Sequence, residues 1–209
     1  MLLFISSEFI SQNLPSRDLI NESGLIVLKN EESNDNILGS VYLHKEWSST
    51  ITLNTINNKT YKFSKANYNI ALDKFVVKIS KDTLLAIDNS KVKFILFDDN
   101  KFERINKKYY ERLSEGNLNL LKEYDVEIKE GLKDAISKIK VTEDKYVIKS
   151  TYYIKTDDNL EKIKPNKRSF NKIFEEQNKK RVKKFMKQHS LSFKKDNDLK
   201  KILKYYNSL

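Results

Sequence analysis

The sequence predicts a mainly β fold of the α+β class, with an antiparallel meander or barrel-like sheet of about 8–10 strands and a small C-terminal segment of about two or three short amphipathic helices. Three observations predict it. From residue 39 to 164, short runs rich in Val, Ile, Thr, Phe and Tyr alternate with Asn, Asp and Lys. After Pro165, apolar residues are spaced three and four apart, as on a helix face. The net positive charge also lies in this last part of the chain.

The chain begins with the short apolar run MLLFISSEFISQ, which has two interpretations. It is either a buried first strand or the remnant of a secretory signal peptide, in which an apolar middle precedes a cleavage site. The run has no basic start, and Glu8 interrupts it. We expect a signal remnant at residues 1–12, an antiparallel β domain at 13–164 and a basic helical segment at 165–209 that packs on the sheet.

The first part of the β domain contains regularly spaced strand-like runs. They occupy residues 24–30, 40–47, 50–56, 59–63, 73–80, 83–88 and 92–99. Asn57 and Asn58 separate two of these runs, and Asn tolerates the left-handed backbone of a tight hairpin. Regular short strands of this kind predict a meander, in which each strand pairs with the one before it.

The second part of the β domain is rich in Glu, Leu and Lys, but its periodicity is that of strands. Between Leu118 and Ile128, apolar and polar residues alternate for much of the run. Two hairpins are expected here, with turns at 114–117 and 157–159. Between them, residues 131–144 are expected to form a surface loop.

The residues after Pro165 predict amphipathic helices. Their apolar sets are Phe170, Ile173 and Phe174; Val182, Phe185, Met186 and His189; and Leu199, Ile202, Leu203 and Tyr206. Ser169 and Asp196 are expected to cap the first and third helices through their side-chain oxygens. Lysines cover the outer faces of these helices.

Positive charge is concentrated at the C-terminal end. Residues 161–209 carry 16 Lys and Arg against 5 Asp and Glu, whereas residues 1–160 carry 24 of each. Three interpretations of this segment stay open: a solvated lysine face, a site for an anionic envelope component or envelope protein, and a nucleic-acid site. The residues expected to contact such a partner are Lys179, Lys180, Arg181, Lys183, Lys184 and Lys187.

Four segments of the chain resemble a group of uncharacterised exported proteins from Bacteroidetes-type bacteria. They are GSVYLHKEW, NYNIALDKFVVKI, YYERLSEGNLNLLKEYDVEI and the C-terminal FMKQHSLSFKKDNDLKKILKYYNSL, of which the last is the most specific. The resemblance covers most of residues 13–209 and implies a signal peptide ending near an SQN-like junction. It implies no activity for any residue. The chain departs from the group in lacking a basic start and in carrying Glu8.

Recognisable catalytic or metal-binding motifs are absent from the sequence. There is no cysteine, and HExxH, GxSxG, Walker and GxGxxG motifs do not occur. His44 and Glu46 are expected to share one face of an edge strand, and His189 to continue an apolar helix face. Trp47 is expected in a core or hairpin-packing role. The sequence thus predicts no enzyme, no metal site and no cofactor.

The function expected from the sequence is that of an exported, non-enzymatic protein of a Gram-negative periplasm or cell envelope. Its basic C-terminal helices are expected to bind an anionic envelope component or an envelope protein. The alternative is a cytosolic nucleic-acid-binding module that uses the same residues. No apolar stretch approaches the roughly 18 residues that a membrane-spanning helix needs.

Overall fold

A computed structural model of the chain describes residues 8–9, 25–29, 37–81, 83–156 and 159–209. These residues divide into two compact units. Unit 1 comprises the described residues up to Tyr109 together with Tyr124–Lys149, and unit 2 comprises Tyr110–Glu123 and the described residues from Ser150 to Leu209. Apart from Glu8 and Phe9, the signal remnant expected at residues 1–12 lies outside the described residues.

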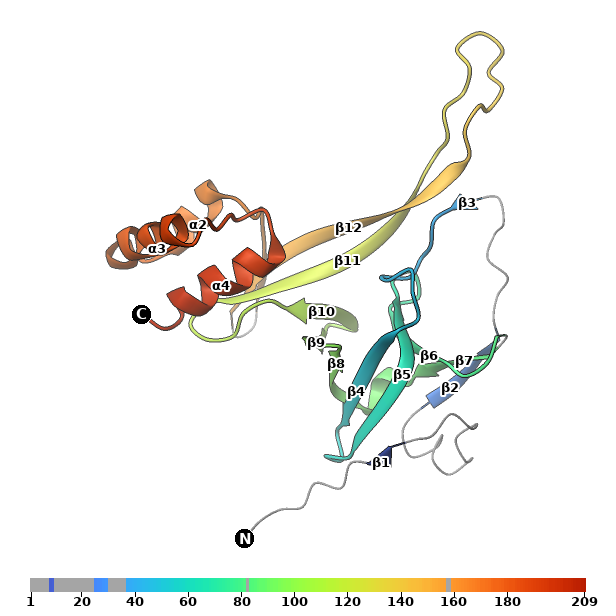
Figure 1. The fold of residues 1–209 in the computed structure, drawn as a ribbon, viewed down its shortest axis with the longest axis horizontal. Coiled ribbons are helices and arrows are strands. Elements are labelled where there is room, and N and C mark those ends of the chain that lie inside the picture. The colour runs from blue at the N-terminus through green and yellow to red at the C-terminus, as the bar shows by residue number, and fades with distance from the viewer. Residues whose placement is uncertain (1–7, 10–24, 30–36, 82, 157–158) are drawn as a thin grey trace. The chain divides into compact units, whose positions relative to one another are not determined.

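Unit 1 is built from strands (Figure 1). Those that lie wholly within it are β1 (Glu8–Phe9), β2 (Leu25–Lys29), β3 (Ile37–Leu38), β4 (Ser49–Thr55), β5 (Thr60–Asn69), β6 (Lys74–Lys78), β7 (Thr83–Ile87), β8 (Val92–Phe97) and β9 (Asn100–Ile105). A 3-10 turn, η1 (Asn89–Lys91), precedes β8. The strands pair in the order β9-β8-β4-β5-β6-β7-β2, and β1 adds to β5 in parallel.

Three strands have residues in both units. They are β10 (Lys108–Arg112), β11 (Asn119–Lys129) and β12 (Asp144–Lys155). In unit 1, the start of β12 also pairs in parallel with β3, so the sheet there is mixed. In unit 2, the remaining parts of these strands and β13 (Leu160–Ile163) follow the order β10-β11-β12-β13. The described strand order is open at both ends rather than closed into a barrel.

The hairpin turns in unit 1 adopt the backbone conformation that their residues favour. Asn58 has a φ of 57° between β4 and β5, and Asp98 a φ of 51° between β8 and β9. Asn and Asp adopt this left-handed region more readily than most residues. In β4 the side chains alternate regularly, with Ile51 and Leu53 fully buried. The hairpin expected at Asn57–Asn58 is therefore confirmed.

The core of unit 1 centres on stacked and edge-on aromatic rings. Phe75 on β6 lies with its ring centroid 4.7 Å from that of Tyr68 and 5.0 Å from that of Tyr109. Phe97 and Phe102 complete the cluster, and all five side chains are at most 2% exposed. Edge-to-face pairs of this kind add stability beyond the burial of their area.

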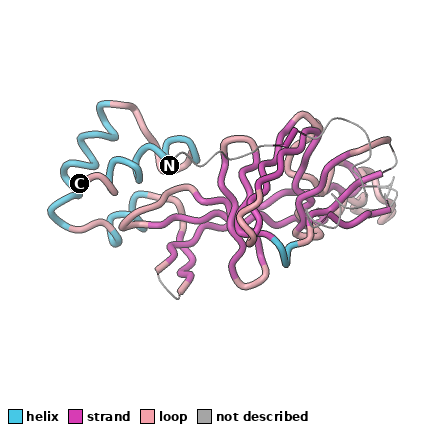
Figure 2. The backbone as a smooth tube through the Cα atoms, turned by 90° about the horizontal axis from the view of Figure 1, so that it is seen from below, coloured by secondary structure: helices cyan, strands magenta, loops and turns pink. Residues whose placement is uncertain are grey.

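Unit 2 contains the helices of the C-terminal segment, α2 (Lys167–Ile173), α3 (Glu176–Gln188) and α4 (Asp196–Tyr206). Figure 2 shows them in cyan beside the magenta strands of the same unit. Leu199, Ile202 and Leu203 of α4 are fully buried in a cluster that also contains Leu120 of β11 and Ile154 of β12. The predicted mainly β fold with a small helical C-terminal segment is confirmed.

The helix caps differ from those expected. Asn166 caps α2, because its Oδ1 accepts a hydrogen bond from the backbone N–H of Ser169 at 3.0 Å. Ser169 lies inside the helix. Lys195 occupies the cap position of α4, and Asp196 follows it in the first turn, where its carboxylate binds Lys122 and Tyr152. In the part of the chain that the structure describes, none of the helices has the length and apolar character that a membrane span requires.

Candidate functional site

Unit 2 has a groove of about 570 Å³ bordered by α2, α3 and the segment that follows α3. We call it the α2–α3 groove. It is lined by Lys167, Asn171, Phe174, Glu176, Lys179, Lys180, Val182, Lys183, Met186 and Phe193. Lysines and an apolar floor therefore occur together in one concave surface.

The floor of the groove is held by aromatic stacking. The ring of Phe193 lies parallel to that of Phe170, with centroids 4.8 Å apart and planes 13° apart. Phe174 stacks on Tyr206 of α4 at 4.5 Å. Since Val182 is only 1% exposed, α3 is anchored by this side chain in the same apolar cluster. The floor is thus a fixed part of the unit 2 core.

Helical periodicity places lysines of α3 along the groove. Successive residues turn by about 100° around a helix, so Lys179 and Lys183 lie on the same side one turn apart, next to Val182. Lys180 and Lys183 are exposed. Their long aliphatic stems can cover apolar surface while the ammonium groups stay in water.

The charge of the groove is positive. Four lysines face one acid, Glu176, whose Oε2 lies 2.5 Å from the Nζ of Lys179. Such an exposed pair one helical turn apart is weak, on the order of 0.3–0.5 kcal/mol. Among the described residues, Lys180 and Lys183 form no ion pair. The groove therefore offers cations that an incoming anion can contact without displacing an acid.

The six residues singled out from the sequence all belong to α3, but they divide between two surfaces. Lys179, Lys180 and Lys183 line the α2–α3 groove. Arg181 and Lys184 are exposed and do not line the groove, and Lys187, which does not line it either, lies in the last turn of the helix.

The sequence did not point to the other groove residues as a site. Lys167 and Asn171 come from α2, and Phe193 comes from the irregular segment after α3. The helical spacing predicted Phe174, Val182 and Met186 as apolar positions, but not that they form the floor of a groove. No periodicity relates Phe193 to these residues, so only the fold brings it to them.

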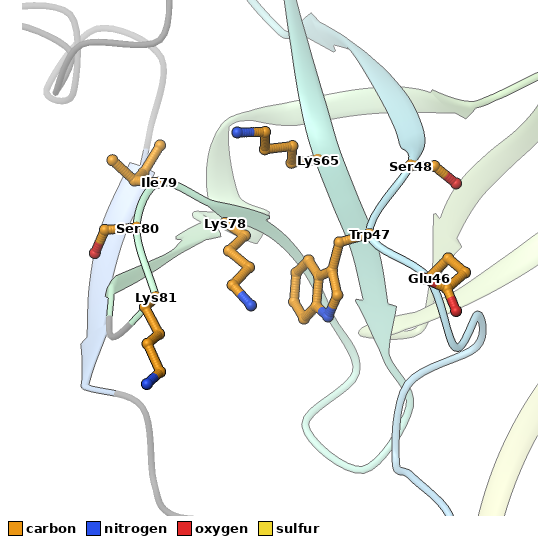
Figure 3. Close-up of a pocket in the computed structure, with 8 residues that line it drawn as sticks. All are labelled: Glu46, Trp47, Ser48, Lys65, Lys78, Ile79, Ser80 and Lys81. Atoms are coloured by element: carbon orange, nitrogen blue, oxygen red, sulfur yellow. The ribbon is translucent and has the colours of Figure 1, made fainter.

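Unit 1 has a second hollow, of about 520 Å³, beside the single tryptophan (Figure 3). The indole of Trp47 and the ammonium group of Lys78 approach one another, with Nζ 5.5 Å from the ring centroid. Tyr42 packs edge-on against the same indole at 4.9 Å. Because Lys78 and Tyr42 already contact the indole, Trp47 is not a bare stacking platform.

The two histidines have packing contacts. The ring of His44 stacks on Phe97 at 5.1 Å, and the ring of His189 lies 4.6 Å from that of Phe185. Glu46 lines the hollow beside Trp47. Within the described ranges, no three His, Cys, Asp or Glu side chains are grouped in a way that could hold a metal ion.

Comparison with known proteins finds no family model, no curated protein and no solved structure that the chain matches.

Proposed function

We propose that unit 2 binds an amphipathic anion, without catalysis, in the α2–α3 groove. The observation that carries this proposal is the joint presence of four lysines and an apolar floor in one hollow. A purely solvated lysine face has no need of a concave apolar surface beneath it. A ligand with a phosphate or carboxylate next to a hydrocarbon portion matches both parts of the groove.

Each part of such a ligand has a partner in the groove. Lys180 and Lys183 supply mobile ammonium donors for a phosphate, which lysine binds as a point charge. Met186 is half-buried at the groove and has a flexible, polarizable side chain that adapts to an irregular apolar ligand. The ligand class is therefore a phosphate-bearing or carboxylate-bearing amphiphile, such as a lipid headgroup with part of its chain.

The proposed setting is the periplasm or envelope of a Gram-negative bacterium. The apolar start of the chain and the resemblance to exported proteins support it, and anionic amphiphiles are abundant at membrane surfaces there. An envelope protein with an acidic, partly apolar segment would match the same chemistry.

Nucleic-acid binding is the second candidate, because the same lysines could neutralise backbone phosphates. Base stacking, however, needs an exposed aromatic face. Phe174 and Phe193 in the groove are 4% and 7% exposed, and Phe185 is stacked on Tyr205 with centroids 4.1 Å apart. Neither ring therefore offers an open face to a base, whereas the flexible side chain of Met186, which is half-buried at the groove, can still contact a hydrocarbon chain. This difference favours the amphiphile over the oligonucleotide.

Two matched triple variants of α3 test the proposal. One combines Lys179→Gln, Lys180→Gln and Lys183→Gln, and the other combines Arg181→Gln, Lys184→Gln and Lys187→Gln. Each removes three positive charges from the same helix. Calorimetric titration with monomeric lysophosphatidylglycerol is expected to show a loss of affinity of about tenfold or more for the groove triple, and of less than about threefold for the other.

Three results would contradict the proposal. Equal losses in the two triples would mean that α3 attracts anions by its total charge alone. Binding of lysophosphatidylcholine as tight as that of lysophosphatidylglycerol would remove the role of the lysines. Binding of an oligonucleotide in place of either amphiphile, with a steep dependence on salt, would establish the second candidate.

A further inference from the structure

The loop between β11 and β12 in unit 1 exposes large aliphatic side chains. They are Leu132, Ile136, Ile139 and Val141, with exposed fractions of 69%, 94%, 67% and 61%. Single exposed aliphatic residues are ordinary on a protein surface, but four within ten positions form a patch that calls for a partner. In Figure 1 this loop, drawn in yellow, extends clear of the β4–β8 strands of the same unit.

Asp134 organises the tip of this loop. Its Oδ1 accepts hydrogen bonds from the backbone N–H of Ile136 at 3.0 Å and from that of Ser137 at 2.7 Å. It also accepts one from the Ser137 hydroxyl at 2.9 Å. These hydrogen bonds lower the pKa of the Asp134 carboxyl and form a compact polar turn beneath Ile136.

The two sides of the loop are joined by backbone hydrogen bonds. The N–H of Val141 donates to the carbonyl of Leu132 at 2.8 Å, and the N–H of Asp134 donates to the carbonyl of Ile139 at the same distance. At the base, a Cβ on Gly131 would lie 1.8 Å from the carbonyl oxygen of Thr142, so only glycine permits this approach. The exposed aliphatic side chains thus stand on an ordered hairpin tip. We call residues 131–142 the β11–β12 tip.

Positive charge surrounds the apolar side chains of the tip. Lys133, Lys138 and Lys140 alternate with them, against the single acid Asp134. At the base, Lys140 pairs with Asp144 at 2.6 Å and Lys133 lies 3.8 Å from Glu130. The outermost lysine, Lys138, forms no ion pair among the described residues.

We propose that the β11–β12 tip inserts into the interfacial region of an anionic lipid bilayer. A small set of aliphatic side chains flanked by lysines matches the acyl boundary below and the negative headgroups around it. Backbone groups that enter an apolar medium need hydrogen-bond partners, and much of this tip supplies them internally. A protruding tip also fits a deformable lipid surface better than it fits a flat, rigid protein surface.

This inference is independent of the α2–α3 groove. The tip belongs to unit 1, the groove to unit 2, and they share no residue. The groove is proposed to hold a single amphiphile, whereas the tip is proposed to contact the bilayer surface. Either proposal can therefore be wrong while the other is correct.

The chain has no cysteine, so a single Ile136→Cys variant can be labelled with an environment-sensitive fluorophore at one position. Asn57→Cys, in the exposed turn between β4 and β5, gives the matched control in the same unit. Vesicles of phosphatidylglycerol are expected to shift the emission at position 136 to the blue and to increase its intensity several-fold. The label at position 57 and vesicles of phosphatidylcholine are expected to give no such change.

A vesicle co-sedimentation assay with unlabelled protein complements the spectra. Ile136→Asp and Ile139→Asp are expected to lower partitioning onto phosphatidylglycerol vesicles about tenfold or more, while the groove triple variant keeps the fluorescence response at position 136. An unshifted spectrum at position 136 on vesicles that retain the protein would overturn the inference. So would an equal response on phosphatidylcholine, or a shift that appears without vesicles as protein concentration rises, since the latter indicates a second copy as the partner.

Discussion

Lys122 of β11 and Asp196 of α4 form an ion pair in unit 2, with Nζ and Oδ2 2.6 Å apart. Lys122 is only 8% exposed, and the hydroxyl of Tyr152 donates to the other carboxylate oxygen of Asp196 at 2.8 Å. Asp196 also stands in the first turn of α4, where the helix dipole favours a negative charge. One carboxylate thus connects a helix to two neighbouring strands.

We expect Asp196→Ala to lower the free energy of unfolding of unit 2 by about 2 kcal/mol, because it removes the carboxylate that pairs with the largely buried ammonium group of Lys122 and accepts from the Tyr152 hydroxyl. Urea unfolding followed by the helical circular dichroism signal measures the loss. Adding Lys122→Met to the same chain is expected to recover most of it, since an apolar side chain of similar length needs no partner. A double variant as unstable as the single one would show that the pair is not the cause.

Asn207, just after α4, connects the C-terminal end of the chain to the turn between β10 and β11. Its Oδ1 accepts from the N–H of Leu118 at 2.9 Å, and its Nδ2 donates to the carbonyls of Leu118 and Glu115 at 3.0 Å. We expect Asn207→Ala to cost about 1–3 kcal/mol, because it removes the partners of backbone groups in that turn. The same unfolding assay checks this, with Ser208→Ala as the exposed neighbour that should change stability by less than about 0.5 kcal/mol.

The turn that Asn207 contacts illustrates what local sequence can predict. Ser114-Glu115-Gly116-Asn117 indicates a turn by composition, and Gly116 has a φ of 135°, which few other residues adopt. That Asn207 would lie against this turn was not predictable, because the two are about ninety positions apart and no short-range pattern relates them. Alternation and turn residues fix hairpins, whereas contacts across the chain depend on the whole fold.

The helices show the same distinction at the candidate site. The spacing of Val182 and Met186 predicted an apolar face of α3, and the structure confirms that Val182 is buried there. Which of the neighbouring lysines line a hollow depends on α2 and on Phe193, which approach α3 only in the folded unit. Asp196 was expected to bind backbone N–H groups, but Lys122 and Tyr152 take its oxygens. A charged partner and a phenol compete effectively for the same carboxylate.

Tyr153 provides a pH-dependent readout of unit 2. Burial, together with its hydrogen bond to Glu123 Oε2 at 2.8 Å and the charge of that carboxylate, raises the pKa of Tyr153 to about 12. The pKa of the phenol is about 10 in an unfolded chain. The folded state therefore disfavours the tyrosinate, so this contribution to stability is complete below pH 10 and is lost as the pH rises to about 12.

We expect the free energy of unfolding of the parent chain to fall more steeply between pH 10 and 12 than that of Tyr153→Phe. The variant has no phenol to ionise at this position, whereas the other tyrosines of the two chains are the same. Urea titrations at pH 9, 10 and 11 measure the difference. Parallel curves for the two proteins across this range would mean that the Tyr153 hydroxyl ionises equally easily in both states.

A substitution at Phe75 tests how much the aromatic core stabilises unit 1. It is fully buried, and its ring contacts those of Tyr68, Phe97, Phe102 and Tyr109. We expect Phe75→Ala to lower the free energy of unfolding by about 4 kcal/mol, because it leaves a cavity among rings that are held in place by their neighbours. Trp47, the single tryptophan, lies in the same unit, so its fluorescence reports the transition directly.

The matched control for Phe75 is Phe94→Ala on β8. Phe94 is only partly buried, and its ring is in contact with the ammonium group of Lys101 at 5.1 Å. Its removal exposes little new cavity surface, so the expected loss is about 1 kcal/mol. Both variants delete the same phenyl group from one sheet. The difference between their losses in free energy of unfolding therefore measures how much complete burial adds to the contribution of a phenylalanine. Equal losses would mean that the five-ring cluster contributes no more than a partly exposed phenylalanine, and that unit 1 is stabilised elsewhere in its sheet.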